Sequence, residues 1–186
     1  MKKALIFAVL ILFALSSAII ATDDEEAMKK TMNIKAIDWN KLAGCLPDKV
    51  EGMKVSELDG GEMSIPDMTN PGTMFSYSFA ERTYSTKDKT IILRITDTGF
   101  NQMLQMPFMM MMEMETPEVS FKNTEIAGNP AKRMINKEKG KVINTQYLVL
   151  ISDRVLVMSE TENTDADEVE ALIKLINFKD LAVLAK

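Results

Sequence analysis

Apolar and polar residues alternate along much of this chain, with the period of two that is typical of half-buried β-strands. The alternation is clearest in residues 74–84, where Phe75, Tyr77 and Phe79 share one face and serines occupy the other. The same pattern and its turn signals predict strands at 53–58, 74–84, 90–97, 119–126, 131–135, 147–151 and 154–158, with hairpin turns at 85–89, 128–129 and 152–153.

Two further segments have the spacing of amphipathic helices. Apolar residues between Ile34 and Cys45 predict a short helix that Leu46-Pro47 ends. Near the C-terminus, Thr164 is expected to cap a helix with an acidic first turn, which favours the helix dipole. Helices gathered on one face of an antiparallel sheet predict the α+β class, as a single domain over residues 34–186 with about six to seven strands. The apolar stripe of the last helix is Val169, Leu172, Ile173 and Ile176.

The first residues carry the features of an export signal. Lys2 and Lys3 precede an uncharged run that extends to Ala21, and small residues near its end suit signal peptidase. We expect residues 1–21 to be a signal peptide and the polar residues 22–33 to be a flexible linker. An uncleaved membrane anchor is the alternative, because the uncharged run reaches the lower limit of a membrane span. The sequence thus predicts export to the periplasm or the extracellular space.

The composition excludes several kinds of chemistry. The chain has no histidine and a single cysteine, Cys45, which excludes Ser/His/Asp and Cys/His catalysis, histidine-based zinc sites and an intrachain disulfide. The net charge of −5 argues against nucleic acid as a partner, since phosphate binding needs a clustered basic surface. No cofactor and no particular oligomeric state are indicated. We expect Cys45 to be a small buried apolar residue.

Methionine is concentrated in one segment. Seven of the 16 methionines fall within the twelve residues 103–114. We predict a helix from Phe100 to Met114, which Pro107 kinks or divides. Because Phe108 and Met111 cover an adjoining face, this helix is apolar most of the way round, unlike an ordinary surface helix. Its methionine face consists of Met103, Met106, Met110 and Met114.

Three interpretations of this segment remain open. The helix is either buried, with methionine as an adaptable filler, or partly exposed as a soft apolar surface for a hydrophobic ligand, a lipid or a partner protein. The third interpretation is a Cu(I) or Ag(I) site, because soft ions favour sulfur ligands. Helical spacing places the thioethers together in all three cases, so the pattern does not separate them. The metal site would use Met103, Met106, Met110 and Met114.

Two charged clusters are weaker candidates. Glu113 and Glu115 could act as the acid and base of a carboxylate-based enzyme, although a solvated helix end is the simpler interpretation. A basic run near residue 135 is typical of a solvated strand edge, and an anionic membrane or acidic partner is the alternative. The run consists of Lys132, Arg133, Lys137, Lys139 and Lys141.

The order of features resembles a family of small exported bacterial proteins of uncharacterised function. The resemblance rests on the Trp39 helix, the aromatic strand with Tyr77, the methionine-rich helix, the hairpin at 126–131 and the closing segment 176–181. More remotely, the order is similar to PsbP and Mog1 domains. That resemblance implies an antiparallel sheet sandwiched by helices and a role in binding or assembly, with no catalytic residues to transfer.

Together these patterns predict an exported binding module without catalysis. We expect its ligand or partner surface to combine the methionine helix with the aromatic strand. The residues expected on this surface are Met103, Met106, Phe108, Met110, Met111, Met114, Phe75, Tyr77 and Phe79.

Overall fold

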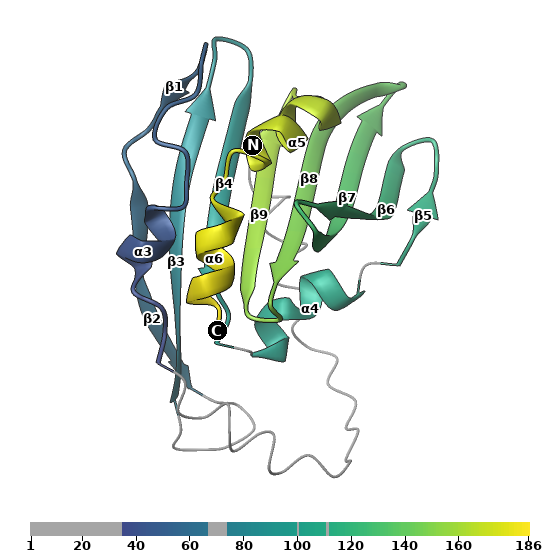
Figure 1. Cartoon of the computed structure of the whole chain (residues 1–186). Coiled ribbons are helices and arrows are strands. Elements are labelled where there is room, and N and C mark those ends of the chain that lie inside the picture. The colour runs from purple at the N-terminus through teal and green to yellow at the C-terminus, as the bar shows by residue number, and fades with distance from the viewer. Residues whose placement is uncertain (1–34, 67–73, 100, 111) are drawn as a thin grey trace.

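The computed structural model describes residues 35–66, 74–99, 101–110 and 112–186. These residues form an antiparallel sheet of nine strands with a few short helices (Figure 1). The predicted α+β class is thereby confirmed, with more strands than the six to seven expected. The predicted signal peptide and linker, residues 1–21 and 22–33, lie outside the described residues.

The elements are labelled as in Figure 1. The strands are β1 (Lys54–Val55), β2 (Asp59–Pro66), β3 (Met74–Ser85), β4 (Thr90–Asp97), β5 (Met114–Glu115), β6 (Val119–Ile126), β7 (Asn129–Glu138), β8 (Lys141–Ile151) and β9 (Val155–Glu162). The helices are α3 (Trp39–Ala43), α4 (Gln102–Met110), α5 (Ala166–Ile173) and α6 (Phe178–Leu184).

Most strands pair with a neighbour along the chain. The strand order is β1-β3-β4-β9-β8-β7-β6-β5, and β2 pairs with β3 beyond β1 on the same edge. Strands β5 to β9 follow one another as a meander. The pairing of β4 with β9 at the centre, where Ile95 lies opposite Val157, joins the two parts of the sheet.

The two faces of the sheet are covered differently. The main core lies between one face and the helices α3, α5 and α6, and its fully buried side chains include Leu93, Tyr147 and Leu181. The opposite face has a smaller buried cluster of Leu148, Leu150 and Leu156. In Figure 1, α5 and α6 lie in front of the sheet, whereas α4 lies at its lower end. We call the face with the smaller cluster the α4 face.

Two-residue turns with positive φ organise the meander. Ala127 and Gly128 join β6 to β7, both in the left-handed region that a tight hairpin requires. The turn is therefore one residue earlier than the predicted 128–129. A second turn of this kind, Lys139-Gly140, was not predicted, so β7 and β8 are longer than expected.

The helix ends also differ from the prediction. The first helix covers only Trp39–Ala43, with Asp38 as its N-cap, and Cys45 lies beyond it. At α5 the cap is Asp165, which accepts from the Glu168 N–H, and not Thr164. The predicted apolar stripe is confirmed as buried, although its last residue, Ile176, lies beyond the end of α5. Helix α6 was not predicted, and it adds Leu181 to the core.

Burial of the lone thiol gives the fold a pH-dependent contribution. Cys45 is 4% exposed, as predicted, and burial followed by the nearby Asp180 carboxylate raises the thiol pKa to about 11, from an ordinary value of 9.0. Between these values the unfolded thiol loses its proton while the folded one retains it. The contribution is therefore complete below pH 9 and is lost as the pH rises toward 11.

We expect the Cys45→Ala variant to lose unfolding free energy less steeply between pH 9 and pH 11 than the unmodified protein does. Urea unfolding at a series of pH values measures this slope. Tyrosine ionisation acts equally on both proteins, so equal slopes would contradict the assignment to Cys45.

Candidate functional site

Helix α4 presents its side chains in two directions. Gln105 is buried and Phe108 is half-buried, whereas Met106 and Met109 are 39% and 59% exposed. The helix ends at Met110, so the predicted helix from Phe100 to Met114 is too long. The chain continues into β5, which contains Met114 and is a strand because it pairs with β6 at Phe121. A single helical face that includes Met114 is therefore wrong.

Some of the predicted surface is outside the described residues. Nothing is described for Met111, and the side chains of Met103 and Met110 are likewise outside the description. The remaining methionines of the segment are exposed: Met106, Met109, Met112 at 82% and Met114 at 45%. The interpretation of the segment as buried filler therefore fails for these four residues.

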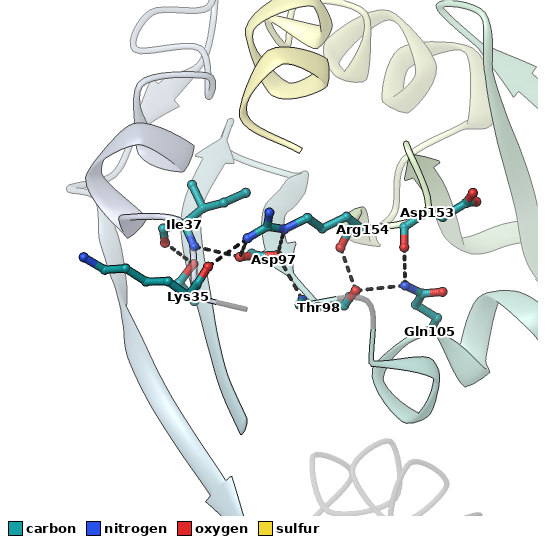
Figure 2. A network of polar contacts seen from close by, with 9 residues as sticks. Lys35, Ile37, Asp97, Thr98, Gln105, Asp153 and Arg154 are labelled. Carbon is teal, nitrogen blue, oxygen red and sulfur yellow. Dashed lines mark hydrogen bonds and ion pairs between the residues drawn. The ribbon is translucent and has the colours of Figure 1, made fainter. Parts of the chain in front are cut away.

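A buried ion pair lies where α4 begins. Asp97, at the end of β4, has no exposed surface, and Arg154 is 7% exposed. The Arg154 Nε and Nη2 groups donate to the two carboxylate oxygens of Asp97 over 2.8 and 2.9 Å (Figure 2). This two-point geometry is the strongest arrangement of a guanidinium and a carboxylate.

The ion pair is connected to the N-terminal end of the described chain. The Ile37 N–H donates to Asp97 over 2.7 Å, and Arg154 Nη2 donates to the Lys35 carbonyl over 3.0 Å. The Ser78 hydroxyl donates to the Ile37 carbonyl. Residues 35–37 are therefore fixed beside β3 and β4 by polar contacts. The same contacts give the buried charges of Asp97 and Arg154 additional hydrogen-bond partners.

Gln105 connects α4 to the same network. Its Nε2 donates to the Thr98 hydroxyl over 2.9 Å and to the Asp153 carbonyl over 2.6 Å (Figure 2). The Thr98 hydroxyl in turn donates to the Arg154 carbonyl. Since these groups are buried or partly buried, each lost hydrogen bond would leave a costly unpaired group. Gln105 therefore anchors one side of α4 while Met106 and Met109 stay exposed.

Phe108 anchors α4 by apolar contact. Its ring packs against the smaller buried cluster, and the Lys132 ammonium of β7 lies 5.3 Å from the ring centroid. A cation at this distance over an aromatic face is attracted by the ring quadrupole. Lys132 therefore contributes to the α4 face, where the sequence predicted a solvated strand edge. The cluster consists of Leu148, Leu150 and Leu156, with Phe108 and Met158 packed against it.

The aromatic strand shares this face with α4. In the antiparallel register Phe79 lies opposite Thr96, Thr96 opposite Leu156, and Leu156 opposite Leu150. Because directly opposed residues point to the same side of a sheet, Phe79 is on the α4 face. Phe75 and Tyr77 follow on it with the period of two. The aromatics and α4 thus share one face of the sheet, and their use as one binding surface stays a prediction.

These aromatic side chains are half-buried and have specific neighbours. Arg94 lies 5.6 Å from the Phe79 ring centroid and donates to Glu81 over 2.7 Å. The Tyr77 hydroxyl donates to the sulfur of Met63 over 3.1 Å, and Met63 is itself 50% exposed. A methionine outside the predicted segment therefore extends the soft apolar surface across β2.

The two carboxylates beside the methionines have local partners. Glu115 accepts from the Ser120 hydroxyl and pairs with Lys122 at 3.0 Å, and these contacts, the Ser120 bond first, lower its pKa. Glu113 accepts from the Asn123 N–H. Both side chains are thus used in holding β5 and β6 together. Within the described ranges, no three His, Cys, Asp or Glu residues gather as a metal site, and the thioether site stays a prediction.

Comparison with known proteins returns no match to a family model, a curated protein or a solved structure. In the part of the chain that the structure describes, each helix is too short or too polar to cross a membrane.

Proposed function

We propose that this protein is an exported binding module without catalysis, and that the α4 face holds an apolar segment of a partner protein. The binding residues of the proposal are Met106, Phe108 and Met109 on α4, together with Phe75, Tyr77 and Phe79 on β3. The observation that carries the proposal is the exposure of Met106 and Met109 on a helix that Gln105 and Phe108 fix in place.

Methionine suits such a surface physically. Its side chain is unbranched and polarisable, so it repacks around partners of different shape. Exposed apolar groups that adjoin one another are also unusual on a monomer and mark interaction sites. The depression beside α4 that Met112 and Phe121 line leaves no room even for water. Among the described residues, the lack of room in this depression supports a macromolecular partner over a small molecule.

The likeness to PsbP and Mog1 domains is part of this proposal. The antiparallel sheet with helices on one face and α4 on the other is compatible with that sandwich architecture. Domains of this kind act in binding or assembly, which agrees with a role for the α4 face. The export signal is likewise part of the proposal.

Site-specific photocrosslinking tests the proposal. A photoreactive amino acid replaces Met106 or Met109 in the full chain, which is expressed in its native cell and irradiated. The control position is Val183 on α6, which is 63% exposed on the other side of the molecule. We expect a discrete protein adduct at 106 and 109 that is at least about tenfold weaker at 183. A Phe79→Lys substitution should reduce that adduct, because it places a charge in the apolar surface.

Two results would contradict the proposal. Equal labelling at all three positions would show non-specific contact. Stoichiometric uptake of Ag(I) that disappears when Met103, Met106 and Met110 are replaced by leucine, without any adduct, would support the soft-metal site instead.

A further inference from the structure

A pocket of about 560 Å³ opens on the molecule away from α4. It is formed by the chain that follows α3, by β3 and by the connection between α5 and α6. Apolar side chains, among them Ala43, Leu58 and the 56% exposed Leu175, form part of its wall. Two charged side chains, Arg82 and Asp48, complete it. This volume lies within the range of small-molecule sites, and the lining is more polar than apolar, which favours a ligand with charged groups.

Arg82 is held in the pocket, but only part of its guanidinium group is hydrogen-bonded within the protein. Its Nη1 donates to the Pro47 carbonyl over 3.0 Å, which also accepts from the Tyr84 hydroxyl over 2.8 Å. The Nε group is buried and has no hydrogen-bond acceptor. No carboxylate of the described residues lies within ion-pair distance of Arg82. In Arg154 the same Nε and Nη2 edge holds a carboxylate.

Asp48 supplies an opposite charge in the same pocket. It is exposed and has no ion-pair partner within the described ranges, Arg82 included. Both groups lie near the Tyr84 hydroxyl. Burial raises the Tyr84 pKa, and Arg82 and Asp48 then act on it in opposite directions. The residues that line the pocket therefore include a cation and an anion, and no ion pair joins them.

We propose that this pocket binds a small zwitterion of the amino-acid class. The ligand carboxylate accepts from the Nη2 group of Arg82, while Nη1 remains bonded to the Pro47 carbonyl. The ligand ammonium pairs with Asp48. Its apolar part rests on Leu58 and Leu175. This site is independent of the proposed α4 face.

Isothermal titration of the purified protein with three matched compounds tests the ligand class. Leucine has both charged groups, 4-methylpentanoate lacks the ammonium, and 3-methylbutylamine lacks the carboxylate. We expect leucine to bind at least about tenfold more tightly than either analogue, because each analogue leaves one charge of the pocket unpaired. Equal affinity for all three compounds would overturn the proposal. So would the absence of binding by leucine, glycine and phenylalanine at millimolar concentration.

Single substitutions test whether Arg82 binds the ligand carboxylate and Asp48 binds the ligand ammonium. Arg82→Met should weaken leucine binding at least about tenfold and abolish the preference for leucine over 3-methylbutylamine. Asp48→Asn should weaken leucine binding but not 4-methylpentanoate binding. Lys54→Met, which removes an exposed charge on neighbouring β1, is the matched control and should leave both affinities unchanged. If Arg82→Met does not fold, judged by circular dichroism, the Asp48→Asn result and the three-compound comparison still decide. Unchanged leucine binding in folded Arg82→Met would overturn the proposal.

Discussion

The Arg154→Met variant is expected to lose about 3–5 kcal/mol of unfolding free energy, because Asp97 would remain buried as an unpaired carboxylate. Asp97 has no exposed surface, and the two hydrogen bonds from Arg154 are lost together. The bond from Arg154 to the Lys35 carbonyl is lost as well. Urea unfolding followed by circular dichroism measures the change, which should appear as a lower midpoint.

An exposed ion pair provides the matched control. Lys174 pairs with Glu170 one turn apart on a helix surface, at 2.8 Å, and its side chain is 56% exposed. Lys174→Met should therefore cost at most about 0.5 kcal/mol. If Arg154→Met costs no more than Lys174→Met, the ion pair does not stabilise the junction of β4, α4 and residues 35–37 as described.

Gly60→Ala should cost about 1–3 kcal/mol of unfolding free energy, because the added methyl group has no space. A Cβ at Gly60 would lie 2.5 Å from the Trp39 ring and 2.7 Å from the Phe79 carbonyl. The Phe79 carbonyl belongs to the backbone of the paired strand, so it cannot move aside as a flexible side chain does. Thermal or urea unfolding measures the loss.

The neighbouring glycine is the control. A Cβ at Gly61 would meet no atom within 4 Å, and Gly61 does not have a positive φ. Gly61→Ala should therefore be neutral or stabilising by a few tenths of a kcal/mol, through reduced freedom of the unfolded chain. Equal losses for the two variants would show that the contact with Trp39 is not what requires glycine.

The strands that alternate cleanly could be predicted from the sequence. Thr90–Asp97 and Val119–Ile126 have the predicted bounds, because polar or glycine-containing turns flank a regular pattern. The strand predicted at 53–58 is shortened to Lys54–Val55, and strand β2 was not predicted, since its two glycines and Pro66 are typical of turns. Pairing along β3 overrides this local preference, as tertiary context often does for strands.

In the candidate site, too, some features could be predicted from the sequence and others could not. Periodicity placed Phe75, Tyr77 and Phe79 on one face of their strand, but it does not say which helix covers that face. It could not decide whether methionines such as Met109 are exposed, because core and surface helices share one spacing. Nor could it pair Asp97 with Arg154, since the two lie 57 residues apart and only the β4–β9 register joins them. Arg82 carries no motif at all.

The central β4–β9 pairing also determines when the chain can fold. Strand β4 ends at residue 97, but its partner is synthesised only with residues 155–162. Until then, β4 has no partner along one edge, and the core of the two parts of the sheet that the β4–β9 pairing joins is incomplete. Contacts this distant in sequence also slow folding, because a large loop must close first. We therefore expect the sheet to close only after residues 155–162 have been synthesised.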